Sequence, residues 1–522
     1  MLGRCVWFWV TVISTVVALA VPKGSPKREL QQLVRLPRVE FGTAIEFHRR
    51  FGFVAFPDES MATAAAAQLS KKSDSASVDP FVHLESGRIY DQQGDSTGAM
   101  RQYSRAIDLL RKRLDVSSEE IRSLAALGEA LTALGRYSEA QAVLDRARTS
   151  GDMQLWLARA NLYRERAWFA AAGEAQRFAN GSFLDQLVAL ATYPPEPTAV
   201  EESKRFLRRA EEAFTRVFEA NASTPAAEEE RLQARAAFRS FQGAMETAYS
   251  QIQNGELRSR SLRNSVVTEQ ALHDLIAAAE MSDDPATIGA SALVVSIAGE
   301  TLAAWSSEAG GADVYVRRVG NRLQAMIDER GENASAAAEF LGCVQLQALK
   351  DSRGAERSFR KALQLEPGRH RSWELLTLAA AQQSPERFVE VAEERAEALP
   401  HPRSSVILVK SYERLGNTLR AEWTALTAAN VYPNDWLVNL SLAAMLLKDE
   451  NAEMFLWRVD EALKKAEKAL GANPKRQQRV DFVLVKSVFL AMSDQTDEAR
   501  KLVETTRPLT PELQEVLRAL GQ

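Results

Sequence analysis

The sequence predicts an all-α solenoid of stacked helix–turn–helix repeats. Four segments, beginning at Gly87, Gly128, Cys343 and Val409, carry small and large residues at matching offsets. The chain has 522 residues, with 46% hydrophobic and 26% charged residues, an ordinary composition for a folded protein but a length too great for one compact core. Because a single helical hairpin cannot bury its own apolar face, neighbouring hairpins must stack on it.

The repeated residues have a mechanical explanation. In the first segment, Gly87 and Ala99 let the backbones of two helices approach closely, and Tyr103 fills the space beside them. Gly94 supplies the turn between the helices, where a positive φ costs it little. The four sets are Gly87, Tyr90, Gly94, Ala99, Tyr103, Ala106; Gly128, Leu131, Gly135, Ala140, Leu144, Ala147; Cys343, Leu346, Lys350, Ala355, Phe359, Ala362, Pro367; and Val409, Tyr412, Gly416, Ala421, Ala425, Ala428, Pro433.

This pattern resembles the tetratricopeptide repeat (TPR), whose signature is W-x2-L-G-x2-Y, then A-x3-F-x2-A, then P. Trp156, Trp373 and Trp436 stand where the first helix of a hairpin, the A helix, should begin. The resemblance implies an α-solenoid of TPR-like repeats that binds a protein or peptide on the concave face lined by the A helices. It implies no cofactor and no catalytic residue, and Cys343 is expected to be a buried packing residue.

Composition divides the chain into five parts. Residues 1–21 are predicted to be a transmembrane anchor or a signal peptide, and residues 22–78 a tether rich in turn-forming and polar residues. Residues 79–190 form the N-terminal TPR block, residues 198–332 a divergent helical region, and residues 333–522 the C-terminal TPR block. A proline-rich stretch at 193–197 marks the boundary after the first block.

The apolar run near the start of the chain carries no charge from Cys5 to Val21. Its 17 residues suit either a short membrane span or a long signal-peptide core. More basic residues follow the segment than precede it, which would keep the body of the protein in the cytoplasm, whereas a signal sequence would export it. The expected location is therefore membrane-associated or exported to the cell envelope, with both topologies open.

Motifs that suggest chemistry have simpler explanations. Residues 94–98 match G-x-S-x-G, but they follow a predicted helix rather than the strand that a nucleophilic serine such as Ser96 requires. The five histidines form no metal-binding spacing, and two cysteines cannot form a metal site. A net charge of −4 argues against nucleic acid as a partner. We therefore expect no metal, no cofactor and no enzymatic activity.

The function predicted from the sequence is a non-catalytic scaffold that binds a protein partner at the membrane or cell envelope. Outward positions on A helices give the candidate binding residues, which are Arg88, Asp91, Arg403, Lys410 and Glu413. Arg403 and Lys410 would suit an acidic partner. The basic clamp with which some TPR proteins hold a C-terminal carboxylate is absent. Two alternatives are an exported component of envelope biogenesis and an enzyme whose site lies within 198–332.

Overall fold

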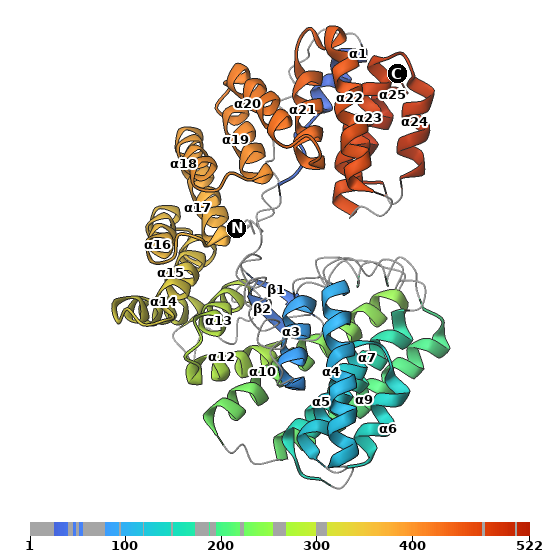
Figure 1. Cartoon of the computed structure of the whole chain (residues 1–522), viewed down its shortest axis with the longest axis vertical. Coiled ribbons are helices and arrows are strands. Elements are labelled where there is room, and N and C mark those ends of the chain that lie inside the picture. The colour runs from blue at the N-terminus through green and yellow to red at the C-terminus, as the bar shows by residue number, and fades with distance from the viewer. Residues whose placement is uncertain are drawn as a thin grey trace, which may run out of the picture. The chain divides into compact units, whose positions relative to one another are not determined.

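The computed structural model describes most of the chain, which is coloured by residue number in Figure 1. The described residues are 26–39, 45–48, 52–55, 79–92, 96–117, 120–147, 150–172, 187, 190, 195–219, 224–253, 268–298, 311–471, 476–506 and 509–521. The apolar segment predicted over 1–21 and the turn residue Gly94 lie outside these ranges. Among the described helices, none has the length and apolar character that crossing a bilayer requires.

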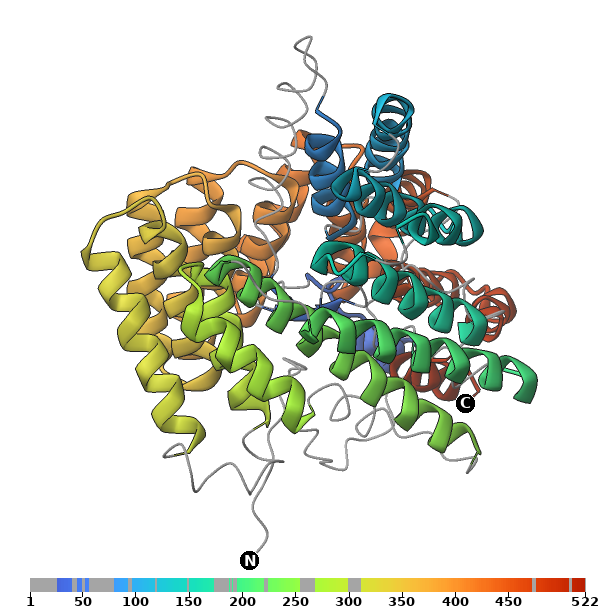
Figure 2. The same cartoon turned by 90° about the horizontal axis from the view of Figure 1, so that it is seen from below.

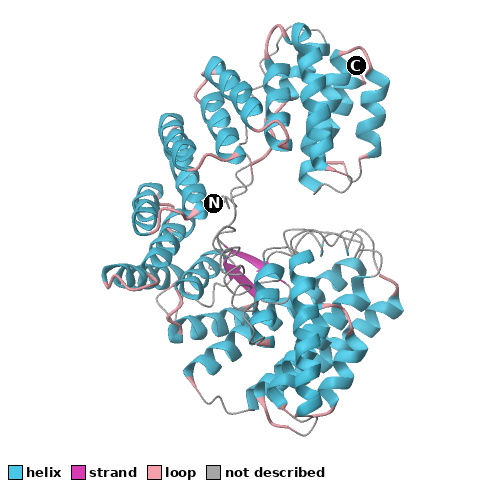
Figure 3. Ribbon diagram, viewed as in Figure 1, coloured by secondary structure: helices cyan, strands magenta, loops and turns pink. Residues whose placement is uncertain are grey.

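The predicted all-α class is confirmed, since helices make up nearly all of the described secondary structure (Figure 3). Within the described ranges the strands are β1 (Ile45–His48) and β2 (Gly52–Ala55), which pair antiparallel with Ile45 opposite Ala55 and His48 opposite Gly52. Strand β2 packs against α10 (Pro225–Gln253) and α13 (Pro285–Ala298).

The chain forms two compact units. Unit 1 combines residues 1–39 with residues 400–522, and unit 2 consists of residues 40–399. The division after Leu399 falls inside the range 333–522, which the sequence pattern suggests as a single block. Unit 1 is therefore discontinuous, because its first segment and its last helices are separated by the whole of unit 2.

Unit 2 is a succession of packed helices, each contacting its neighbours along the chain. Figure 2 shows the later members, α14 to α17, lying side by side. They are α3 (Pro80–Gln92), α4 (Ser96–Val116), α5 (Ile121–Ala133), α6 (Tyr137–Asp145), α7 (Met153–Ala172), α9 (Pro197–Glu219), α10 (Pro225–Gln253), α12 (Glu269–Met281), α13 (Pro285–Ala298), α14 (Ala312–Asp328), α15 (Ala334–Cys343), the π-helix η3 (Val344–Ala348), α16 (Ser352–Leu365), α17 (His370–Gln383) and α18 (Pro385–Ala398).

The first two repeats pack as their small residues predict. A Cβ atom added to Gly87 would lie 2.7 Å from the ring of Tyr103, and one added to Gly128 would lie 2.5 Å from Leu144. Contacts this short show that both hairpins require glycine on the A helix. At the next turn, Gly135 has a φ of +72°, a conformation that glycine adopts without strain.

The third repeat departs from its predicted register by one residue. The close approach to Phe359 is made by Gly342, where a Cβ would lie 2.5 Å from the ring, and not by Cys343. The π-helix η3 causes the shift, because its wider turn adds one residue between the close contact and the next helix. Cys343 is nevertheless fully buried, as expected, and burial raises the pKa of its thiol to about 12.

Unit 1 contains three further hairpins, a last single helix and a short N-terminal helix. Its elements are α19 (Pro402–Arg414), α20 (Thr418–Val431), α21 (Trp436–Lys448), the 3-10 helix η4 (Ala452–Phe455), α22 (Leu456–Leu470), α23 (Arg476–Met492), α24 (Thr496–Thr505), α25 (Pro511–Leu520) and α1 (Pro26–Leu33). Gly416 forms the α19–α20 turn with a φ of +81°. Asn417 and Asp435 cap the helices that follow them by accepting hydrogen bonds from Arg420 and Val438 backbone N–H groups.

Candidate partner-binding surface

Part of the predicted tether is folded onto the A helices of unit 1. Helix α1 and the extended residues 34–39 contact α21, α23 and α25, which are A helices of the last hairpins and the final single helix. Leu30, Val34, Leu36 and Val39 are all buried in this contact. We call the contacted sides of α21, α23 and α25 the A-helix surface, and residues 26–39 the N-terminal segment. A segment of the same chain therefore covers these sides of α21, α23 and α25.

The start of the N-terminal segment is held by carbonyl groups at the ends of α21 and α23. Lys27 Nζ donates to the carbonyl oxygen of Met492 over 3.2 Å and lies 2.9 Å from an Asp494 carboxylate oxygen. Gln31 Nε2 donates to the carbonyl oxygens of Leu447 and Asp449, each at 3.3 Å. The last carbonyls of a helix have no partner within the helix, and Lys27 and Gln31 donate to such groups at the ends of α23 and α21; the Asp449 carbonyl also accepts from the Ala452 backbone N–H.

The end of the segment is fixed by carboxylates. The Arg38 backbone N–H donates to Asp481 Oδ2 over 2.8 Å, and its guanidinium pairs with Glu512 on α25. Asp481 also accepts a hydrogen bond from Gln477 Nε2 at 2.8 Å. Burial raises the pKa of the Asp481 carboxyl, and the Arg38 contact opposes that shift. Asp481 and Glu512 thus hold Arg38 through both its backbone and its side chain.

Two of the predicted binding residues lie beside this contact. Lys410 and Glu413 are on α19, and Glu413 forms an ion pair with Lys448 at the end of α21. Lys410 is partly buried, and desolvation lowers the pKa of its amine to about 8, although Asp481 and Glu413 act in the opposite direction. The structure therefore brings Lys410 and Glu413 into the electrostatic environment of the N-terminal segment.

The other three predicted residues are not gathered at that place. Arg88 is in unit 2, where its Nε donates to Glu129 Oε1 at 2.6 Å in a two-pronged pair between α3 and α5. Glu129 is the dominant cause of a raised Arg88 pKa. Asp91 is partly buried on α3. Arg403 lies in the first turn of α19, where its backbone N–H donates to His401 Nδ1 at 3.2 Å.

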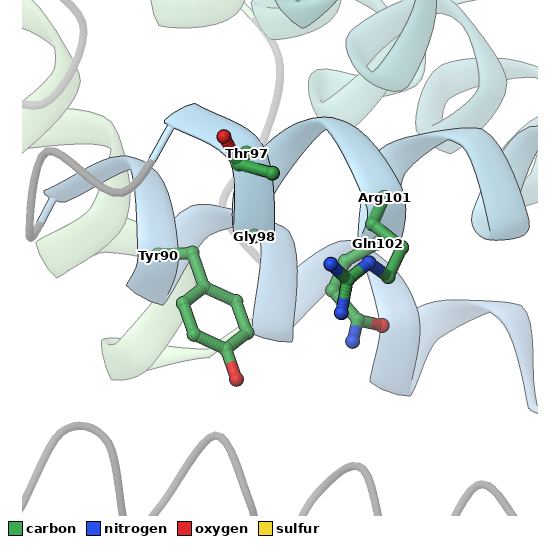
Figure 4. Close-up of a pocket in the computed structure, with 5 residues that line it drawn as sticks. All are labelled: Tyr90, Thr97, Gly98, Arg101 and Gln102. Carbon is green, nitrogen blue, oxygen red and sulfur yellow. The ribbon is translucent and has the colours of Figure 1, made fainter.

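A small recess opens at the start of α4 (Figure 4). Its volume is about 120 Å³, and it is lined by Tyr90, Thr97, Gly98, Arg101 and Gln102. Sites for drug-sized ligands and cofactors are roughly 300–1,000 Å³. The recess is therefore too small for such a molecule, and we assign it no ligand.

The alternative of an enzyme within 198–332 has no supporting site in the described part of that range. Its most buried carboxylate, Asp274, lies 2.8 Å from Arg235 Nε and 2.9 Å from a terminal nitrogen of Arg239. These two bonds go to Oδ2, and a terminal nitrogen of Arg235 donates to Oδ1, so both carboxylate oxygens are satisfied by arginine, as in a structural ion pair. In the described ranges, no group of three or more histidine, cysteine or acidic side chains is arranged to hold a metal.

The N-terminal segment was not foreseen from the sequence. Leu30 and Val34 are four residues apart, which is a helical spacing, and Leu36 follows at a spacing typical of an extended chain. That signal is short, and the partners of these residues lie more than 400 positions away. Local patterns indicate an apolar face but do not identify what covers it.

No protein-family model and no curated protein matches the chain. Among solved structures, it is similar to the crystal structure of yeast Tom70, with 14% sequence identity, a TM-score of 0.37, and coverage of 88% of this chain and 91% of that chain. It is also similar to the APC/C hetero-tetramer Cut9-Hcn1, with 13% identity, a TM-score of 0.30, and coverage of 89% and 87%. Both TM-scores are low, so the TPR-like fold rests on the hairpin packing described above.

Proposed function

We propose that the protein is a non-catalytic scaffold that binds a short segment of a partner protein on the A-helix surface of unit 1. The observation that carries this proposal is the N-terminal segment itself. It is 14 residues long, is held by buried apolar side chains and polar contacts at both ends, and occupies the surface as a bound peptide would. A partner would take its place.

The chemistry of the surface favours a basic, apolar partner segment. The N-terminal segment has four basic residues and one acidic residue, a net charge of +3. The groups that pair with it are acidic, namely Glu453, Asp494, Asp481 and Glu512. An acidic partner, as Arg403 and Lys410 alone would suggest, would meet these carboxylates unfavourably. We therefore infer a partner with leucine or valine at spaced positions and lysine or arginine between them.

Competition between the two occupants provides the test. A fluorescent peptide with the sequence of residues 26–39 would be titrated with the full chain and with its Val34→Asp, Leu36→Asp variant, and binding followed by anisotropy. The aspartates should release the intramolecular segment. Because a tethered competitor acts at an effective concentration near millimolar, the variant should bind the peptide at least ~10-fold more tightly.

Two controls make the result decisive. A peptide carrying the same two aspartates should not bind, and circular dichroism of the variant should retain the helical signal of the parent. Adding Asp481→Asn and Glu512→Gln to the released variant should weaken peptide binding again, since both carboxylates hold Arg38. If the Val34→Asp, Leu36→Asp variant is folded but does not bind the peptide, the proposed binding surface is wrong.

We further propose that residues 1–21 attach this scaffold to a membrane or direct its export, placing it at the cell envelope. The support is the uncharged run from Cys5 to Val21. Mass spectrometry of the mature N-terminus separates the two cases. A chain that starts at Val21 has been exported and cleaved, whereas an intact Met1 with a protease-accessible body in the cytosol shows the opposite topology.

A further inference from the structure

Large apolar side chains are exposed on two consecutive hairpins of unit 1. Leu419 is 81% exposed and Trp423 is 73% exposed, one helical turn apart on the outer side of α20. Met454, in η4, is 72% exposed, and Trp457, at the start of α22, is 67% exposed. Tryptophan, leucine and methionine exposed together on a folded protein usually mark a contact with another apolar surface.

These side chains share one edge of unit 1, which we call the turn edge. Leu419 follows the α19–α20 turn, and Met454 and Trp457 follow the α21–α22 turn. Helix α21 packs against both α19 and α20, so the equivalent turns of the two hairpins lie on the same side. Val431, at the opposite end of α20, is 12 residues or about 18 Å from Leu419 along the helix and lies at the other edge.

The N-terminal segment begins at the same edge. Lys27 Nζ lies 3.7 Å from Glu453, the residue before Met454, and 2.9 Å from Asp494 in the α23–α24 turn. Only residues 22–25 separate α1 from the uncharged run that ends at Val21. Four extended residues reach at most ~14 Å. The membrane that receives the apolar run can therefore be only a short distance from the start of α1, which lies beside Glu453.

We propose that the turn edge of unit 1 rests on the headgroup region of the bilayer that residues 5–21 enter, with Trp423 and Trp457 at the membrane interface. The inference rests on the membrane attachment within the proposed function. Tryptophan side chains concentrate at this depth because the indole combines an apolar body with one polar group. Glu453 and Asp494 share the single cation of Lys27 and remain exposed, so this edge is not basic; the proposed attraction is apolar and does not require anionic lipid.

A matched pair of labelled chains tests the proposal. In the full chain with Cys5→Ser, either Met454→Cys or Val431→Cys would carry an environment-sensitive nitrobenzoxadiazole label. Cys343 is fully buried and should not react. Both labelled positions are exposed apolar residues, 72% and 61% respectively, at opposite edges of unit 1. The chains would be reconstituted into phosphatidylcholine vesicles, with and without doxyl-labelled lipid.

In vesicles, the label at position 454 should shift to the blue, brighten about two-fold or more and be quenched by doxyl lipid, as at a membrane interface. The label at position 431 should stay water-like. Adding Trp423→Ser and Trp457→Ser should reduce the quenching at 454.

Three results would overturn the inference in different ways. If the chains float with the vesicles but the label at position 454 has the fluorescence it shows in water, residues 5–21 attach the protein to the membrane and the turn edge does not contact it. A blue-shifted label at 454 without vesicles would show that residues 5–21 or a second copy of the chain cover the edge. Chains that do not float would contradict the tether itself, and none of these outcomes bears on peptide capture by the A-helix surface.

Discussion

Replacing Gly342 with alanine should destabilise unit 2, although alanine is normally the better helix residue. The added Cβ would lie 2.5 Å from Phe359 Cε1 and 2.7 Å from its Cδ1, about 1 Å inside an ordinary carbon contact. Phe359 is fully buried and cannot swing aside. Overpacking of this kind costs ~1–3 kcal/mol, whereas the helix gains ~1 kcal/mol from losing a glycine. The net loss should therefore be up to ~2 kcal/mol.

Gly320 supplies the matched control for this substitution. It lies within α14, and its added Cβ would meet Leu341 Cδ1 at 3.7 Å, an ordinary contact. Gly320→Ala should therefore stabilise the unit by up to ~1 kcal/mol, through helix propensity alone. The two alanine substitutions are chemically identical and should have opposite signs.

Urea unfolding followed by circular dichroism measures both effects as shifts in midpoint. Phe359→Leu should restore part of the stability lost in Gly342→Ala, giving a coupling energy in a double-mutant cycle. If Gly342→Ala raises the midpoint as Gly320→Ala does, the close approach in the third repeat is wrong. Equal effects of Phe359→Leu with and without the alanine would lead to the same conclusion.

Three other predictions follow from single residues. Lys350 has a φ of +57° at the turn where the fourth repeat has Gly416, so Lys350→Gly should raise the free energy of unfolding by ~0.5–1 kcal/mol. A lower urea midpoint would contradict this. A double-mutant cycle on Arg88 and Glu129 should give a coupling of ~0.5–1 kcal/mol that shrinks in 1 M salt, because both side chains are partly exposed. The pKa of Lys410 in the folded state is about 8, below its ordinary value of 10.5, so the folded state binds fewer protons than the unfolded state between these two pH values and stability should rise with pH across that window. Lys410→Met should remove this pH dependence and be more stable than the parent at pH 7. Urea midpoints measured at pH 7 and pH 10 check both expectations.

The hairpins could be predicted from the sequence because their packing depends on residues close together in the chain. Gly87 and Tyr103, or Gly128 and Leu144, are 16 residues apart, and each pair reports directly on one helix crossing. The predicted register of the third repeat was wrong by one position, because a π-helix is set by backbone geometry and tertiary packing. Nothing in the side chains of Val344 to Ala348 distinguishes it from an α-helix.

The candidate surface was only partly predictable for a different reason. Lys410 and Glu413 stand at outward positions of an A helix, and helical spacing identified them. Asp481 and Arg38, which influence the pKa of Lys410, come from distant parts of the chain, so this influence cannot be predicted before the fold is known. Arg88 illustrates the same limit. Its position on an A helix suggested a partner-binding side chain, but in the folded structure it pairs with Glu129 of the same chain.

The discontinuity of unit 1 has a consequence for synthesis. The bond between Lys27 and Met492 joins residues 465 positions apart, so α1 has no docking site until nearly the whole chain has been made. At 5–20 residues per second, that interval is roughly 20–90 s. During this time the basic N-terminal segment and the apolar run before it are both accessible on the nascent chain. A targeting factor or chaperone can therefore bind these segments before the last repeats are synthesised. Once α25 is complete, the N-terminal segment can dock and is no longer accessible.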